Sequence, residues 1–326
     1  MKRLFLLLAF GCIGNLLADA QTAPAHPFSY HNYWIVTQGI INDTLPANFC
    51  LDTAAEGISL DSSFVRTHSL NKKELQTGFF GADTEKVKQL LAKQGMKLPD
   101  FGEGGVGNGK TQMKRAFEAI KYEAGNHPFT APFYKVYRRL PAGEALLGIN
   151  PSQQLTFEIY YPEKTFKLYP GTPQLTFDSS WTRLKMTRHA VKATVPLKIK
   201  IGKKSISGDF LLDTGSAHTL SLTAQTVHEK KLHELENIRT WKGSGLSGTS
   251  EGGVLTAEYV QIGKDRLPHV DIHLSYDQSG ALAGSNYYIG IIGNKILEKY
   301  DVVIDYVNLY LYLRPNAQHD TPVAAE

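Results

Sequence analysis

Two aspartates occur at matching places in this chain, each at the end of an apolar run. Asp213 lies in the sequence Phe-Leu-Leu-Asp-Thr-Gly-Ser at residues 210–216, and Asp52 lies in a weaker copy, Phe-Cys-Leu-Asp-Thr-Ala-Ala, at residues 49–55. Such a run predicts a buried strand that ends in a tight turn, so each carboxylate is placed at the mouth of a turn. Two carboxyl groups brought close together share a proton, which suits them to act as general acid and general base on a bound water.

Two glycine-rich stretches have the letters of nucleotide-binding motifs. Residues 104–111 read Gly-Gly-Val-Gly-Asn-Gly-Lys-Thr and fit the phosphate-loop pattern, while residues 243–248 fit the G-x-G-x-x-G pattern. Both motifs bind phosphates where a buried strand precedes the loop and a helix follows it, and neither stretch has that setting. Because the two stretches occupy corresponding places in the two halves, we interpret both as hairpin or flap glycines and expect no nucleotide cofactor.

The histidines and cysteines do not form a convincing metal or nucleophile motif. His228 and His233 are five residues apart, whereas a helical zinc motif needs a spacing of four. His269 and His273 have that spacing, but in a segment that alternates like a strand. We expect solvated histidines, no metal and no cofactor, and we interpret Cys50, on the strand of the first aspartate, as an apolar packing residue.

The charge of the chain narrows the classes of partner. The formal net charge is +4, with lysines and glutamates mixed throughout and no basic cluster of the kind that follows a phosphate backbone. We therefore expect no nucleic-acid partner. Beyond the N-terminal segment no stretch reaches the roughly 18 apolar residues that a membrane helix needs, so we also expect no membrane span.

The blocks that follow the two aspartates also match each other. Leu-Leu-Gly at residues 146–148 and Ile-Ile-Gly at residues 291–293 are 145 residues apart, and the same offset places residues 159–161 on residues 304–306. The two aspartates are 161 residues apart, so the first half carries 16 additional residues between its Asp and its Gly. This pattern indicates an internal duplication with one insertion.

The second half begins with Asp-Thr-Gly-Ser and ends with apolar-apolar-Gly, a short helical stretch and a final strand. This arrangement resembles one lobe of a pepsin/retropepsin-like aspartic protease. The resemblance extends to both halves of the chain, as in the two-lobed, exported, bacterial-type form of this family. The match is strong in the second half and weaker in the first, where Ala54 stands in place of the family's Gly. The resemblance implies an all-β fold of two β-barrel lobes, related by a pseudo-twofold axis, with a cleft between them and a few short helices.

The resemblance also implies what the matching residues do. Asp52 and Asp213 would form the catalytic dyad of an aspartic endopeptidase that hydrolyses peptide or protein substrates with an activated water. Thr53 and Thr214 would cross-link the two loops through hydroxyl-to-backbone bonds and keep the carboxylates coplanar. The Gly148 and Gly293 segments would pack behind these loops.

Three further positions next to the dyad have implied roles. Gly215 would let the backbone pass close to the dyad and the substrate. Ser216 would donate a hydrogen bond to the outer oxygen of Asp213. Ala54 adds a methyl group where the family lets substrate approach the backbone, although it keeps its N–H group.

Ala54 leaves alternatives open. The first is a peptide-binding pseudoprotease that keeps the cleft and has lost the chemistry at Asp52-Thr53-Ala54. The second is a structural or carrier β-protein in which both aspartates simply end strands, which the matched Leu-Leu-Gly and Ile-Ile-Gly blocks argue against. The third is a homodimeric site that uses Asp213 of two chains. Since a second full lobe makes a partner copy unnecessary, we expect a monomer.

The first 20 residues have the form of an export signal. They combine two basic residues, a short apolar core over residues 4–17 and a small-x-small cleavage site over residues 18–20. We therefore expect an exported protein, periplasmic or secreted. Lipid attachment at Cys12 is the alternative, but the branched apolar residue that usually precedes such a cysteine by three positions is missing.

The remaining boundaries follow from turn and linker signals. We expect a first lobe over residues 21–172, a linker over 173–190, a second lobe over 191–315 and a disordered tail over 316–326. In the first lobe, Asp61 or Ser62 is suited to cap a short helix, and a second helix is expected between Asp83 and Gly95.

Overall fold

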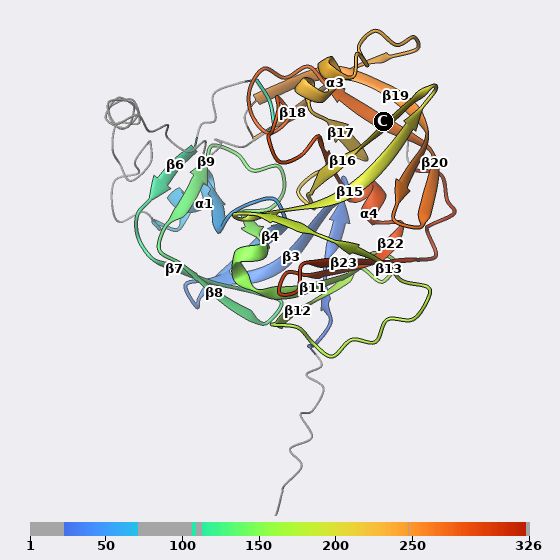
Figure 1. The fold of residues 1–326 in the computed structure, drawn as a ribbon. Helices are drawn as coiled ribbons and strands as arrows, with labels where there is room; N and C mark the ends of the chain where they lie inside the picture. The colour runs from blue at the N-terminus through green and yellow to red at the C-terminus, as the bar shows by residue number, and fades with distance from the viewer. Residues whose placement is uncertain (1–22, 71–105, 109–112, 247, 324–326) are drawn as a thin grey trace, which may run out of the picture.

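Strands form nearly all of the regular structure of the computed structural model, which describes residues 23–70, 106–108, 113–246 and 248–323. Within these ranges they build three sheets: one for each half of the chain and one shared by both. In Figure 1 most blue and green strands of the first half lie at the lower left, and most yellow and orange strands of the second half lie at the upper right. The prediction of an all-β fold with two lobes and a few short helices is confirmed.

The first lobe is a nine-stranded sheet in the order β6-β9-β5-β10-β4-β3-β7-β8, with β2 beside β3. Its centre is the parallel pair of β4 and β10, in which Phe49 lies opposite Ala145 and Asp52 lies opposite Gly148. Because β10 is covered on both faces, it is an uninterrupted apolar run. The strands are β2 (Ser29–His31), β3 (Trp34–Ile41), β4 (Leu45–Asp52), β5 (Ile58–Asp61), β6 (Met113–Ala116), β7 (Ile120–Ala124), β8 (His127–Ala131), β9 (Tyr134–Tyr137) and β10 (Ala145–Gly148).

The second lobe is an eight-stranded sheet in the order β14-β15-β16-β21-β17-β20-β19-β18. An additional pairing of β15 with β19 folds this sheet back on itself, which gives it the character of a barrel. The parallel pair at its centre is β16 with β21, the counterpart of β4 with β10. The strands are β14 (Thr187–His189), β15 (Lys192–Ile201), β16 (Lys204–Leu212), β17 (Leu220–Leu222), β18 (Arg239–Gly245), β19 (Gly248–Ile262), β20 (Asp265–Ser275) and β21 (Gly290–Ile292).

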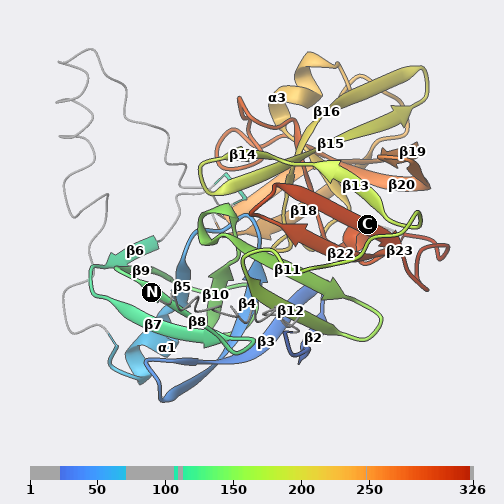
Figure 2. The same ribbon diagram turned by 60° about the horizontal axis from the view of Figure 1, so that its bottom comes forward.

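The shared sheet joins the last hairpins of the two halves. Its order is β1-β12-β11-β22-β23-β13, and β11 runs antiparallel to β22 at its centre. Figure 2 shows the green hairpin β11–β12 beside the red hairpin β22–β23. The strands are β1 (His26–Pro27), β11 (Leu155–Tyr160), β12 (Thr165–Pro170), β13 (Thr182–Lys185), β22 (Tyr300–Asp305) and β23 (Tyr310–Pro315).

The helices of the described ranges are short, and the first two begin after a capping side chain. Asp61 caps α1 (Ser62–Thr67) by accepting a hydrogen bond from the Ser63 N–H, as its place before the helix predicts. Thr223 caps α3 (Ala224–Glu229) in the same way. The helix α4 (Asn294–Leu297) and the 3₁₀ turn η2 (Pro151–Gln153) each follow an apolar-apolar-Gly block. The helix expected between Asp83 and Gly95 lies outside the described residues.

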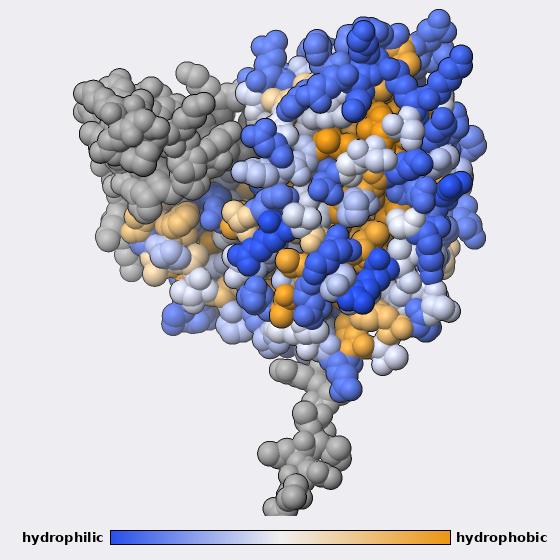
Figure 3. Space-filling view, viewed as in Figure 1, coloured by the Kyte–Doolittle hydropathy of each residue, from blue (hydrophilic) through white to orange (hydrophobic). Residues whose placement is uncertain are grey.

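Apolar side chains gather in the core, and polar side chains cover most of the surface (Figure 3). Figure 3 shows hydrophilic side chains over most of one face, with apolar side chains in a narrow band between them. The largest side chains of the core are fully buried aromatic residues, among them Phe49, Phe157 and Phe210. No helix in the described ranges is long and apolar enough to cross a membrane.

The C-terminal tail differs from its prediction, because residues 316–323 lie against the second lobe. The Asn316 side chain donates to the Glu298 carbonyl at 3.0 Å, and the Lys299 ammonium group donates to the Thr321 hydroxyl at 2.8 Å. His319 lies 2.7 Å from the Asp265 carboxylate. The tail is polar, which suggested disorder, but its polar groups bind the ends of other elements, and no local pattern reveals those partners.

Candidate active site

Asp52 and Asp213 stand at the ends of the central strands of the two lobes. Asp52 is the last residue of β4, and Asp213 directly follows β16. Each is anchored to the matched glycine block, because Asp52 pairs with Gly148 and the Asp213 N–H donates to the Ile292 carbonyl at 3.1 Å. The buried parallel pair in each lobe therefore fixes where its aspartate emerges.

Thr53 and Thr214 tie the two turns together across the lobe boundary. The Thr53 N–H donates to the Thr214 hydroxyl at 3.1 Å, and the Thr214 N–H donates to the Thr53 hydroxyl at 2.9 Å. The Thr53 hydroxyl then donates to the Leu212 carbonyl at 2.9 Å, and the Thr214 hydroxyl to the Leu51 carbonyl at 2.8 Å. Both threonines are fully buried. Each hydroxyl thus accepts one bond and donates another, which fixes the two turns face to face.

The two carboxyl groups receive unequal numbers of backbone donors. One oxygen of Asp52 accepts hydrogen bonds from the N–H groups of Ala54 at 2.8 Å and Ala55 at 2.9 Å. The carboxyl of Asp213 accepts one such bond, from the Gly215 N–H at 2.9 Å. Because N–H donors stabilise the ionised form, Asp52 is the better site for the negative charge.

Burial raises the pKa of both carboxyls, and the charge of Asp52 raises that of Asp213 further. For Asp213, burial is the main cause and the negative charge of Asp52 adds to it, so its pKa lies well above the ordinary value. For Asp52, burial also raises the pKa, while the Ala54 and Ala55 N–H groups and a hydrogen bond with Asp213 oppose the rise. A proton shared by the pair therefore resides mainly on Asp213.

Gly215 is confined by the carboxyl of the other lobe. A Cβ atom added to Gly215 would lie 2.4 Å from Asp52 Oδ2 and 2.5 Å from its Cγ, which is too close for any side chain. Ala54, at the matching position of the first lobe, has its methyl group packed against a small apolar cluster while its N–H still binds Asp52. That cluster consists of Leu211, Leu282, Tyr288 and Ile291.

The two matched glycines lie directly behind the turns. A Cβ atom on Gly148 would lie 2.5 Å from the Ala55 carbonyl oxygen, and one on Gly293 would lie 2.4 Å from the His218 carbonyl oxygen and 2.8 Å from that of Ser216. A side chain at either glycine would push the adjacent aspartate loop forward. This close approach explains why both blocks end in Gly.

Ser216 is placed differently from the role that the resemblance implies. Its backbone N–H donates to the Asp213 carbonyl at 3.2 Å. Its hydroxyl makes no hydrogen bond to the Asp213 carboxyl, although both residues are described, and it lies instead against the backbone of Gly293. The carboxyl of Asp213 therefore lacks a hydroxyl donor from this turn, which adds to the imbalance between the two carboxyls.

The described residues of the first glycine-rich stretch contact the second stretch, which belongs to the hairpin of β18 and β19. Gly107 lies so close to Gly248 that a Cβ atom on Gly107 would be 2.4 Å from the Gly248 carbonyl oxygen. The Asn108 N–H donates to the Thr249 carbonyl at 2.9 Å, and the Asn108 side chain donates to Asp277 at 3.2 Å. The residues of the first stretch that the structure describes thus contact the hairpin formed by the second.

The histidines show one difference from the expectation of solvated rings. His273 is buried, and its ring centroid lies 4.4 Å from that of His218 and 4.8 Å from that of Trp241. His228 and His233 stack at 5.6 Å on the surface of the second lobe. The expectation was wrong for His273 because its strand, β20, is covered by neighbouring elements on both faces. In the described ranges, no group of three or more potential metal ligands occurs.

Cys50 is a buried residue whose thiol is not activated. It is 1% exposed, and burial together with the negative charges of Asp52 and Asp213 raises the pKa of its thiol. A thiolate is therefore strongly disfavoured, and the side chain acts as a small apolar packing group.

Sequence reasoning missed two asparagines that brace the turns. The Asn294 side chain donates to the Thr214 carbonyl at 2.6 Å and to the Tyr33 carbonyl at 2.7 Å. The Asn150 side chain donates to the Ala55 carbonyl at 2.9 Å. Each asparagine comes one or two residues after a matched glycine, and that recurrence is the signal that would have found them.

Lys135 was also missed, since it stands far from both turns in the sequence. Its ammonium group donates to the Glu56 carbonyl at 3.3 Å and lies 3.5 Å from the Glu56 carboxylate. Its positive charge lowers the pKa of Asp52. In the sequence it reads as the exposed member of an alternating strand, which gives no sign of this position.

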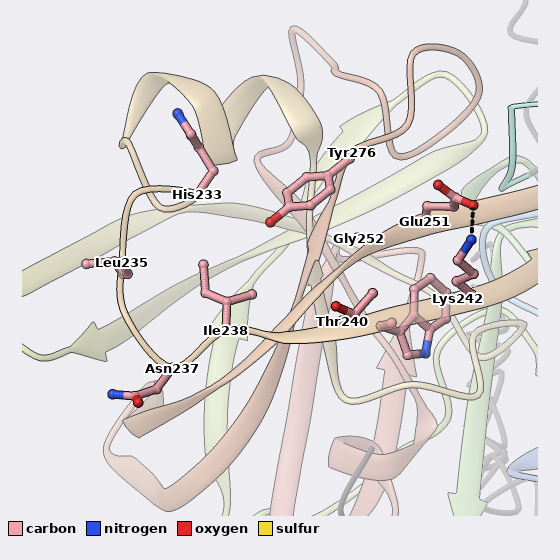
Figure 4. A pocket seen from close by; sticks show the side chains of 10 residues that line it. His233, Leu235, Asn237, Ile238, Thr240, Lys242, Glu251, Gly252 and Tyr276 are labelled. Atoms are coloured by element: carbon pink, nitrogen blue, oxygen red, sulfur yellow. Dashed lines mark hydrogen bonds and ion pairs between the residues drawn. The ribbon is translucent and has the colours of Figure 1, made fainter.

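A separate hollow lies on the second lobe. Its volume is about 440 Å³, and it lies between β18, β19 and the loop after β20. The ion pair of Lys242 and Glu251, whose charged groups are 2.7 Å apart, lies at one end of this pocket (Figure 4). The side chains of Ile238 and Tyr276 point into it. None of the residues of the two aspartate turns lines this pocket, so it is not part of the candidate site.

Comparison with known proteins finds similarity of structure alone. No family model matches the sequence, and no curated protein matches it. Among solved structures, the chain is similar to an aspartic proteinase from Irpex lacteus with a TM-score of 0.53 and 13% identity, over 93% of this chain and 100% of that chain. At such low identity the similarity concerns the fold. The chain thus has the two-lobed fold of an aspartic proteinase.

Proposed function

We propose that this protein is an exported aspartic endopeptidase in which Asp52 and Asp213 hydrolyse peptide bonds through an activated water. The observation that carries the proposal is the reciprocal bonding of Thr53 and Thr214, which fixes the turns of the two aspartates face to face. Aspartates that merely end two strands would need no such bonds between lobes. The similarity of the fold to an aspartic proteinase supports the same reading.

The asymmetry of the pair supports one order of proton transfers. Asp52, ionised and held by two N–H donors, accepts a proton from a water bound between the carboxyls while the water oxygen attacks the carbonyl carbon. Asp213 donates its proton to the carbonyl oxygen, so a neutral gem-diol forms. Asp52 then protonates the amide nitrogen, Asp213 recovers a proton from one hydroxyl of the diol, and the C–N bond breaks. The pair returns to its starting protonation, and it titrates as a unit.

The environment of Ala54 is compatible with this chemistry. The Ala54 N–H still donates to Asp52, and its methyl group packs against an apolar cluster of the second lobe. This placement favours the enzyme over a peptide-binding pseudoprotease. Both aspartates come from one chain, which supports a monomeric site over one built from two copies of Asp213. The proposed substrate is an extended peptide or protein segment, and export rests on the form of residues 1–20.

The test is peptide cleavage by the chain from residue 21 onward, measured from about pH 3 to about pH 7. Asp52→Asn and Asp213→Asn are each expected to abolish cleavage, while Asp43→Asn, at an exposed aspartate of the first lobe, leaves it unchanged. If Asp213→Asn alone matters, a homodimeric site replaces the proposal. If the wild type cleaves nothing yet binds a statine-type inhibitor, the protein is a peptide-binding module.

A further inference from the structure

Two buried tyrosines end the central strands of the shared sheet. Tyr161 directly follows β11 and Tyr306 directly follows β22, and they are 145 residues apart, which makes them equivalent in the duplication. They are 2% and 1% exposed. A buried phenolic hydroxyl needs a hydrogen-bond partner, so the partners of these two groups are informative.

The Tyr306 hydroxyl reaches the first lobe, although Tyr306 belongs to the second half of the chain. It donates to the Ile149 carbonyl at 2.9 Å, and the Ile149 N–H in turn donates to the Asp52 carbonyl at 2.9 Å. It therefore contacts the segment that lies directly behind the Asp52 turn.

The Tyr161 hydroxyl makes the reverse crossing. Tyr161 belongs to the first half, and its hydroxyl donates to the Asn294 side-chain oxygen at 2.7 Å. The Asn294 amide nitrogen donates to the Thr214 carbonyl at 2.6 Å, and the Asn294 backbone N–H donates to the Ser216 carbonyl at 2.9 Å. One side chain thus links Tyr161 to two residues of the Asp213 turn.

We propose that Tyr306 and Tyr161 are crossed positioning residues, each of which fixes the aspartate turn of the opposite lobe through its hydroxyl. The role rests on the proposed function, because positioning matters when two carboxyls must share one proton and one water. A rigid ring with a fixed hydroxyl can hold a loop to within a fraction of an ångström, which is the tolerance of a catalytic pair. Because the shared sheet carries both tyrosines, it couples the relative placement of the lobes to the alignment of the carboxyls.

The two crossings are unequal. Tyr306 binds the backbone behind Asp52 directly, whereas Tyr161 acts through the Asn294 side chain. Removal of the Tyr306 hydroxyl also leaves the Ile149 carbonyl without this partner in the core, while the Asn294 side chain keeps its bonds to Thr214 and Tyr33. We therefore expect the larger effect at Tyr306.

The experiment replaces each hydroxyl and keeps each ring. Tyr306→Phe is expected to lower kcat by about tenfold, with KM within about twofold of wild type, and Tyr161→Phe to lower kcat by a smaller factor. The affinity of a statine-type inhibitor should fall with kcat, because such a ligand occupies the aligned site. Tyr300→Phe is the matched control: Tyr300 is also 1% exposed and its hydroxyl binds Asp265, away from both turns. The Tyr300→Phe variant should have a lower free energy of unfolding and an unchanged kcat.

A second measurement is independent of catalysis. Amide hydrogen exchange at Thr53 and Thr214 in the ligand-free protein should become at least about tenfold faster in Tyr306→Phe than in Tyr300→Phe. If the wild type cleaves no peptide, the proposed function fails while this exchange still tests the tyrosines. The inference is overturned if Tyr306→Phe and Tyr161→Phe both keep the kcat, the inhibitor affinity and the amide exchange rates of the wild type. It is also overturned if their changes in these quantities are no larger than those of Tyr300→Phe.

Discussion

Glu158 lies opposite Val303 in the central pair of the shared sheet, and the two residues are 145 apart in the chain, which is the offset of the duplication. Glu158 and Val303 are therefore equivalent residues of the two halves that pair with each other, and the pseudo-twofold axis passes between them. Because β11 and β22 are antiparallel, equivalent residues beyond this pair lie at opposite ends of the two strands. This explains why Tyr161 and Tyr306, three residues beyond it in each half, cross to opposite lobes.

The threonine bonds between the lobes should contribute to stability as well as alignment. Thr214→Val removes the hydroxyl that serves the Thr53 N–H and the Leu51 carbonyl, so two buried groups lose partners at a cost of about 2 kcal/mol or more. Denaturant unfolding and kcat should both report the loss, and Thr214→Ser should restore most of each. Thr37→Val, at a buried threonine that binds the Pro27 carbonyl, is expected to keep kcat. Retention of stability and kcat in Thr214→Val would contradict the role of these bonds.

Gly215 and Ala54 occupy matching positions and should respond differently to a methyl group. Gly215→Ala places a Cβ atom 2.4 Å from Asp52 Oδ2 and should lower kcat by about a hundredfold or more, because the carboxyl must move. Ala54→Gly removes a methyl group with apolar neighbours and should cost about 1 kcal/mol while kcat is kept. Steady-state kinetics on both variants measure this difference in kcat. An active Gly215→Ala enzyme would show that the turn yields more easily than its contacts indicate.

Lys135 should set the acid limb of the pH profile. Burial raises the pKa of Asp52 and the positive charge of Lys135 lowers it, so removal of this charge raises that pKa further. Catalysis requires ionised Asp52, and the acid limb of kcat/KM should therefore move to higher pH in Lys135→Met. Lys121→Met, at an exposed lysine beside Asp43, serves as the control. A limb that stays in place or moves to lower pH would refute this assignment.

His319 should make the attachment of the C-terminal tail depend on pH. Burial opposes its charge, but hydrogen bonds to Asp320 and Asp265 outweigh burial and raise its pKa above 6.5. Its contribution to stability is therefore fully present below pH 6.5 and is lost as the pH rises through the higher folded-state value. His319→Gln should cost about 0.5–1 kcal/mol near pH 5.5 and less near pH 9, as measured by urea unfolding.

The control for His319→Gln is a substitution of an exposed histidine in the first lobe. His31→Gln should show no such difference between the two pH values, since His31 lies on the surface. An equal cost of His319→Gln at both pH values would mean that its packing, and not its charge, holds the tail.

The sequence by itself determined the parts of this protein that depend on local pattern. Local pattern predicted the duplication, the two strand-to-turn aspartates, a helix cap at Asp61 or Ser62 and the all-β class. These features repeat along the chain or depend on neighbours within a few residues, so alternation, turn residues and capping preferences reveal them.

Tertiary structure alone decided which distant groups meet. The burial of His273, the position of the Ser216 hydroxyl and the attachment of the tail through His319 all differ from expectation. The crossing of Tyr161 and Tyr306 had no counterpart in the sequence analysis. In each case the side chain meets groups from another strand or from a distant part of the chain. The packing of sheets and lobes sets such pairings, and periodicity or composition carries no record of them.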